Sequence, residues 1–150
     1  METHIQNQFR SDMFIKEACQ NKYVFALKNT EGFVTCESNL EIDGAEPPPS
    51  VFCIWSSEVL AKAAKKAHWE SAQLFKIPLE EFMEAWCIGM EEDGYLAGIN
   101  FNANLFGQEL FGYDLILELL DACEKEGIIL ELNRFESIET FREAILAACK

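Results

Sequence analysis

The amino-acid sequence predicts a single α+β domain over residues 1–150, with a mixed or mostly antiparallel sheet and helices packed on it. The first indication is size, because 150 residues with 49% hydrophobic content suit one core and are too few for two. The second is the order in which helical and strand-like patterns follow one another along the chain. This order contains too few consecutive βαβ units for a doubly wound sheet and too many helices for a β-sandwich.

The N-terminal part of the chain predicts a helix followed by a β-hairpin. Thr3 and Gln6 have capping-box spacing, and apolar residues then recur at helical intervals to about residue 19. Residues 22–28 and 33–37 alternate in character on either side of the turn sequence NTEG, which is the pattern of paired strands.

Residues 38–50 (SNLEIDGAEPPPS) break every period, and three prolines stand together in them. Proline cannot continue a helix or occupy the middle of a sheet. We therefore expect a mobile loop here. The apolar run VFCIW at 51–55 reads as a short strand, and Ser56 or Ser57 can cap the alanine-rich helix that follows.

A second helix is expected from Pro78 to Gly89, because proline suits a first turn and apolar residues recur at i, i+3, i+4 and i+7. The sequence EEDG at 91–94 then predicts a turn, and residues 95–101 alternate as a strand. Residues 102–110 are expected to be a loop with a short strand.

The C-terminal part predicts a helix, a strand and a last helix. Asp114 is suited to open a helix that ends at Gly127, since apolar residues form a stripe between them. The alternating sequence IILELN at 128–133 predicts a strand. Ser137 is then a suitable cap for a final helix.

Charge is distributed unevenly along the chain. The net charge is −14, and residues 77–150 hold 16 acidic against 4 basic residues, a formal charge of −12. Such a field repels nucleic acid and anionic membrane surfaces and attracts basic proteins. We expect a basic protein partner, no nucleic acid and no membrane, although acidic residues that only keep a small protein soluble are the alternative.

Several classes of site have no counterpart in the sequence. No apolar run approaches the roughly 20 residues of a membrane span, and residues 1–10 lack an export pattern, so a cytoplasmic protein is expected. The six cysteines lie far apart without C-x-x-C, which favours reduced core thiols over disulfides or zinc. Neither metal-ligand spacing nor a nucleotide-binding motif occurs, so no metal and no cofactor is expected.

The segment from Cys53 to Trp69 poses a choice between chemistry and packing. Cys53 and Trp55 share a strand face, and His68 lies about three turns into the next helix. A Cys53–His68 pair would make a nucleophile only if the sulfur were accessible and within reach of the imidazole. Core packing is the favoured interpretation. The alternative is a ligand pocket with candidate residues Trp55, Trp69, Trp86, His68 and Cys53.

The carboxylates allow two interpretations. Glu80, Glu81 and Glu84 are spaced as a solvated helix face near its positive end. A continuous acidic patch that meets a basic partner is the functional alternative. Its candidate binding residues are Glu91, Glu92, Asp93, Glu118, Asp121 and Glu124.

Three segments resemble a known family in this order: VFCIWSSEVLAKAAKKAHWE at 51–70, IPLEEFMEAW at 77–86 and EEDGYLAGINF at 91–101. They are similar to the bacterial family called domain of unknown function 2750. The resemblance covers about residues 22–110 and leaves 111–150 as a C-terminal extension. It implies a small cytosolic bacterial protein without established catalytic residues, and some small acidic proteins of this kind are similar to immunity proteins that block a toxin.

These observations together favour a non-catalytic bacterial cytosolic binding protein rather than an enzyme. The leading hypothesis is an immunity-type inhibitor whose acidic surface covers a basic toxin domain. The alternative is a small-molecule or regulatory binding module that uses the tryptophan-lined pocket.

Overall fold

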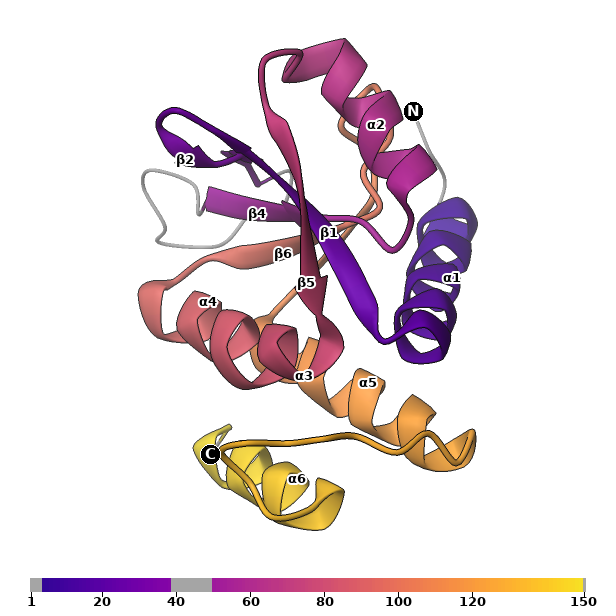
Figure 1. Ribbon diagram of the computed structural model, residues 1–150, viewed down its shortest axis with the longest axis vertical. Coiled ribbons are helices and arrows are strands. Elements are labelled where there is room, and N and C mark those ends of the chain that lie inside the picture. Colours follow the sequence, from indigo (N-terminus) through magenta and orange to yellow (C-terminus); the bar gives the residue numbers. More distant parts are fainter. Residues whose placement is uncertain (1–3, 39–49, 150) are drawn as a thin grey trace.

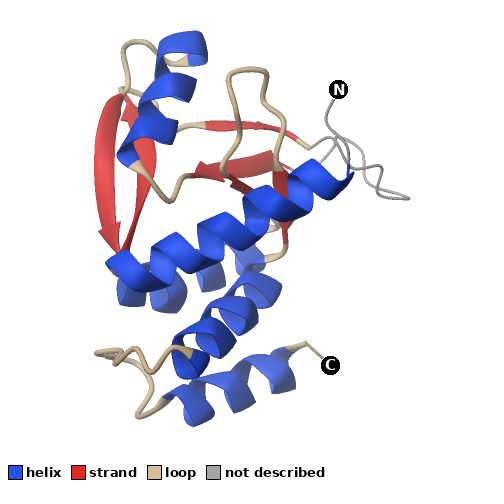
Figure 2. Ribbon diagram, turned by 90° about the vertical axis from the view of Figure 1, so that its right-hand side faces the viewer, coloured by secondary structure: helices blue, strands red, loops and turns tan. Residues whose placement is uncertain are grey.

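Two small sheets run across one another in one half of the molecule, helices pack above, beside and below them, and the two C-terminal helices form the opposite end (Figures 1 and 2). The computed structural model describes residues 4–38 and 50–149. The proline-rich loop expected at residues 38–50 therefore lies outside the described residues, except for its two end residues. The expected α+β class, with helices on a sheet, is confirmed.

The first sheet is antiparallel, with the order β2-β1-β5. Strand β1 (Tyr23–Asn29) pairs with the short β2 (Gly32–Phe33) on one side, which confirms the expected hairpin. On its other side β1 pairs along six residues with β5 (Gln73–Pro78). The sequence did not predict β5, because only Ile77 of its six side chains is fully buried and no alternation shows.

The second sheet is mixed, with the order β3-β4-β6-β7. Strand β4 runs parallel to β6, while the two outer pairs are antiparallel. An isolated bridge between Phe25 and Trp55 joins the two sheets through backbone hydrogen bonds of 2.7 and 2.9 Å. The strands of this sheet are β3 (Thr35–Glu37), β4 (Ser50–Ile54), β6 (Leu96–Ile99) and β7 (Gln108–Leu110).

Helices cover both sheets. Ser57 caps α2 by accepting the Leu60 N–H, and Ser137 caps α6 in the same way, as expected. No helix in the described part of the chain is long and apolar enough to cross a membrane. The helices are α1 (His4–Asn21), α2 (Glu58–His68), α3 (Leu79–Glu81), the π-helical segment η1 (Phe82–Cys87), α4 (Ile88–Asp93), α5 (Gly112–Lys125) and α6 (Ile138–Ala148).

The segments α3, η1 and α4 follow one another without a break, and we call them the 79–93 helix. The expected end at Gly89 is wrong. The helix ends at Gly94, whose φ of 80° is left-handed, and the Tyr95 N–H bonds back to the Met90 carbonyl. The residues expected to form a turn, 91–93, therefore belong to the last helical turn.

Alternation along β4 divides the core into two clusters. Cys53 and Trp55 point to the face that α2 covers, and Ile54 points to the face covered by α1, the 79–93 helix and α5. All three side chains are fully buried. The expected sharing of a face by Cys53 and Trp55 is confirmed, and it follows from the two-residue period of a strand.

The strand expected at 128–133 is absent, because carboxylates of the 79–93 helix bind the backbone that a strand would have used. The N–H of Glu131 donates to Glu80 at 3.0 Å, and the N–H of Asn133 donates to both Glu84 oxygens at 2.9 and 3.0 Å. Glu84 is 3% exposed. The solvated face expected for Glu80 and Glu84 is therefore wrong, while Glu81 is exposed as expected.

Candidate functional site

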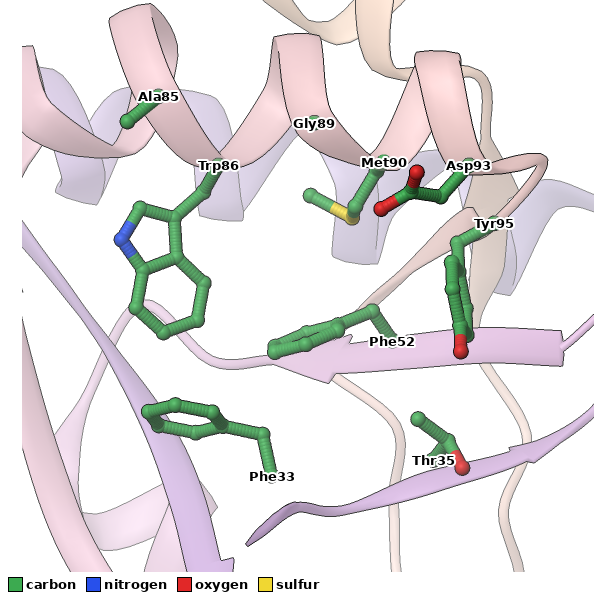
Figure 3. A pocket seen from close by; sticks show the side chains of 9 residues that line it. All are labelled: Phe33, Thr35, Phe52, Ala85, Trp86, Gly89, Met90, Asp93 and Tyr95. Atoms are coloured by element: carbon green, nitrogen blue, oxygen red, sulfur yellow. The ribbon is translucent and has the colours of Figure 1, made fainter.

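A groove lies between the 79–93 helix and the strands that it covers. Figure 3 shows Trp86, Met90 and Asp93 descending from the helix toward Phe52, with Tyr95 at one end. The volume is about 450 Å³, which is within the range of ligand sites in proteins. The lining residues are Phe33, Thr35, Phe52, Ala85, Trp86, Gly89, Met90, Asp93 and Tyr95.

One wall of the groove is aromatic. The Trp86 ring meets Phe33 at 4.6 Å between centroids and Phe52 at 5.3 Å, in both cases close to perpendicular. Edge-to-face contacts of this kind add stability beyond the buried area and fix the orientation of the rings. Lys28 already places its ammonium 5.2 Å from the Phe33 centroid, so this wall holds one cation from within the chain.

The helix leaves space in the groove at Gly89. A Cβ added there would have no neighbour within 4 Å, so no packing contact requires a glycine. Glycine in a helix interior costs about 1 kcal/mol relative to alanine. The residue therefore lowers helix stability and keeps the groove open between Trp86 and Asp93.

Carboxylates gather at the end of the helix where its dipole is negative. Glu91, Glu92 and Asp93 form the last turn of α4, which has no basic residue. The macrodipole disfavours anions at this end, by about 0.3–1 kcal/mol each on an exposed surface. Asp93 lines the groove and is exposed. Glu92 is also exposed but is not one of the lining residues. An aromatic wall and a negative lip thus belong to the same groove.

A sequence model described as "Protein of unknown function (DUF2750)" matches residues 11–119. The chain belongs to this family. The match extends beyond the expected 22–110 and takes in most of α1 and the first half of α5, while α6 lies outside it. No significant match was found among curated proteins or among solved structures.

The groove of this DUF2750 family member contains only one of its three tryptophans. Trp86 lies on the Phe52 face of β4, whereas Trp55 lies on the opposite face, where it meets Trp69 at 6.1 Å. Trp55 is fully buried and its Nε1 donates to the Phe101 carbonyl at 2.9 Å. Trp86 is therefore separated from the other four candidates of the expected tryptophan pocket. Those four lie on one side of β4, where Cys53, Trp55 and Trp69 pack together and His68 lies beside Trp69.

Cys53 and His68 do not form a nucleophilic pair. The His68 ring bonds to the Ala103 carbonyl and lies beside Trp69, while the Cys53 sulfur lies 3.8 Å from that of Cys36. Contact with the Cys36 thiol and burial raise the pKa of Cys53. The sulfur is fully buried, so Cys53 is a packed part of the core, while His68 is exposed.

The six candidate acidic residues fall into two groups. The first is at the end of α4, where Glu91 accepts the Tyr113 N–H at 3.1 Å at the start of α5. The second group is Glu118, Asp121 and Glu124 on α5. Asp121 is eight residues beyond Tyr113, which Glu91 binds, and the helix rises about 12 Å over that distance. This rise separates the two groups.

Two of the three carboxylates on α5 are bound by an arginine of the same chain. Arg142 of α6 donates to Asp121 at 2.9 Å and to Glu124 at 3.1 Å. Partial burial raises the pKa of Glu118, and the negative charges of Asp114, Asp12 and Asp121 raise it further. This second group faces α1 and α6, whereas Asp93 lines the aromatic groove.

Sequence reasoning missed most of the groove. Its helical side consists of Trp86, Gly89, Met90 and Asp93, which have the spacing i, i+3, i+4, i+7 of one helix face. That stripe was hidden because the helix was expected to end at Gly89. In the described residues, no three His, Cys, Asp or Glu side chains are placed to hold a metal ion.

Proposed function

We propose that this protein is a non-catalytic binding protein that holds a basic segment of a partner protein in the aromatic groove. The observation that carries the proposal is the position of Asp93 on the same groove as Trp86 and Phe52. A lysine or arginine side chain matches both features, because its charge is attracted by ring faces and by a carboxylate.

Charge across the whole molecule supports the same class of partner. The net charge of −14 would attract a basic protein and speed its association, with a strong dependence on salt. Aromatic residues in a groove would then supply the binding energy, since tryptophan and tyrosine dominate binding hot spots. Glu91 binds the Tyr113 N–H, but the cost of the exposed Glu92 and Asp93 at a helix C-terminus supports a role for them beyond stability.

More specifically, we propose an immunity-type inhibitor that acts in a bacterial cytosol and covers a basic toxin domain. The cognate toxin would place an arginine or lysine side chain in the groove. Its basic surface would then be covered by this protein. Of the six acidic candidates, only Asp93 lines the groove, and the proposed acidic recognition surface is therefore centred on Asp93.

The second candidate is a small-molecule or regulatory binding module. It is favoured by the groove volume of about 450 Å³, which would suit a free organic cation of metabolite size. Trp86 lines the groove, so its fluorescence would report such a ligand.

A labelled octa-arginine peptide tests the proposal by fluorescence anisotropy at low and high salt. We expect Asp93→Asn to weaken binding about five- to tenfold, because a charged contact at the groove is lost. Glu136→Gln is the matched control, since it removes the same charge from an exposed residue outside the groove. Equal weakening by the two variants would mean that binding follows net charge alone, and the groove would have no role.

A quaternary ammonium compound distinguishes the second candidate. If tetramethylammonium changes Trp86 fluorescence and competes with the peptide at millimolar concentration, the groove takes free cations. If only the peptide binds, a protein partner is favoured.

A further inference from the structure

Two cysteines lie side by side between α1 and α5, away from the aromatic groove. The sulfur of Cys19 on α1 is 3.1 Å from the sulfur of Cys123 on α5. Both side chains are buried, at 1% and 0% exposed. The chain brings them together although they are 104 residues apart in sequence.

A second groove leads to this pair. It has a volume of about 370 Å³ and runs between α1 and α5, with Lys16 and Gln20 on one side and Asp121 and Lys125 on the other. Cys19 is one of its lining residues. An oxidant the size of hydrogen peroxide that reaches Cys19 also meets Cys123, because the two sulfurs are in contact.

The contact is a direct one between the two thiols, in which Cys123 donates to the Cys19 sulfur. Contact with Cys19 lowers the pKa of Cys123 and Lys22 acts in the same direction, whereas burial and Glu80 raise it. The same contact, together with burial, raises the pKa of Cys19. The geometry therefore places each sulfur where it can attack an oxidised form of the other without any movement of the helices.

We propose that Cys19 and Cys123 form a redox-active dithiol, which a peroxide converts to a reversible disulfide between α1 and α5. The Cys123 sulfur attacks one peroxide oxygen, the O–O bond breaks, and a sulfenic acid forms. The other oxygen leaves as hydroxide and becomes water by taking the proton that Cys123 gives up. The Cys19 sulfur then attacks the sulfenic sulfur and loses its proton, and the sulfenic oxygen leaves as a second water. Two thiols are oxidised and one peroxide is reduced to two waters.

The other close pair of cysteines is less suited to this reaction. Cys36 and Cys53 have sulfurs 3.8 Å apart, but the register pairs Cys36 with Val51, so Cys53 is its diagonal neighbour. Diagonal residues on antiparallel strands are about 7–8 Å apart at Cα, whereas disulfides need less than about 6.8 Å. Cys19 and Cys123 sit on helices that pack together and have no such register constraint.

Oxidation would tie the two helices together and stabilise the chain. The new bond would close a loop of about 100 residues, which strongly restricts the unfolded state. In a reducing compartment the bond would be transient, as intracellular disulfides with a sensing role are.

The test uses the full-length chain with the exposed thiol removed by Cys149→Ser. The reduced protein is treated with hydrogen peroxide, its remaining thiols are alkylated, and its mass and peptides are measured. We expect a loss of 2 Da and a Cys19–Cys123 peptide, a rise of roughly 5–15 °C in Tm, and reversal of all three by dithiothreitol. A link between Cys36 and Cys53, oxygen added without a link, or no reaction under conditions that oxidise the urea-unfolded chain would each overturn the proposal.

Two further variants in the same background separate the pairs. Cys36→Ala removes the other pair and should leave the mass loss and the Tm rise intact. Cys123→Ala should abolish both. If Cys123→Ala does not fold, the peptide map of the Cys149→Ser protein alone still decides which sulfurs are joined.

Discussion

Replacing Glu84 by glutamine tests how the C-terminal part of the chain is held to the rest. The Glu84 carboxylate is 3% exposed and accepts the backbone N–H groups of Asn133 and Arg134. The Arg134 guanidinium donates to the Glu84 carbonyl at 2.8 Å. This one residue therefore fixes the connection between α5 and α6 to the π-helical segment η1.

The expected loss of stability follows from these contacts. Glu84→Gln keeps one side-chain oxygen and replaces the other with an amide that faces a backbone donor. A hydrogen bond to a charged group contributes about 1.5–3 kcal/mol, and an unmatched buried donor adds to the loss. We expect the free energy of unfolding to fall by about 2–4 kcal/mol, which lowers Tm by roughly 5–15 °C in a chain of this length.

Thermal unfolding and amide hydrogen exchange measure the effect, with Glu81→Gln as the control. Glu81 lies on the same helix but is exposed, so its replacement should change stability by less than about 0.5 kcal/mol. In the Glu84 variant the Asn133 and Arg134 amides should exchange much faster. Equal stability of the two variants, with unchanged exchange at these amides, would show that the Glu84 carboxylate does not hold the segment between α5 and α6.

Three further predictions concern helix ends and the groove. Burial disfavours the charged form of Glu80, but the Glu131 N–H and Lys22 bind its carboxylate and lower its pKa below the ordinary value. The carboxylate therefore stabilises the fold above about pH 4.5, and this stabilisation is lost as the pH falls. In Glu80→Gln the free energy of unfolding should change less with pH between pH 2 and 5. Gly112→Ala should lower stability by about 1–3 kcal/mol in denaturant titrations, since a Cβ would lie 2.2 Å from the Cys87 carbonyl oxygen. Gly89→Ala should raise stability by up to about 1 kcal/mol in the same assay, because nothing lies within 4 Å of the new methyl group.

Local signals predicted most of the helices and the N-terminal caps of two of them, but Asp114, expected to open α5, lies in its first turn. Ser57 and Ser137 are capping residues in the structure, and the period of β4 places Cys53 and Trp55 together in the core. These features depend on residues a few positions apart, so the sequence alone carries them.

Features that depend on distant partners were not predicted correctly. Strand β5 exists because β1 pairs with it along six residues, and its own pattern of exposed side chains gives no sign of this. Residues 128–133 alternate like a strand, but their N–H groups bind Glu80 and Glu84, which lie about 50 positions earlier in the chain. Tertiary contacts of this kind override a local pattern.

The candidate site was likewise predicted only in part, because its residues come from distant parts of the chain. Sequence reasoning identified Trp86 as a pocket residue and Asp93 as an acidic binding residue, but assigned them to different surfaces. They share a groove because the helix continues through Gly89 to Asp93. Phe33 and Phe52 complete the groove from two strands, and their meeting depends on how the sheets cross.

The most direct test of the central claim is to fill the aromatic groove and measure the affinity for the octa-arginine peptide. Gly89→Leu would add an isobutyl group at a residue that lines the groove, and its Cβ would have no atom within 4 Å. We expect at least about tenfold weaker binding than for the unaltered chain, with Tm and circular dichroism preserved. A folded Gly89→Leu protein that binds the peptide as tightly as the unaltered chain would contradict it.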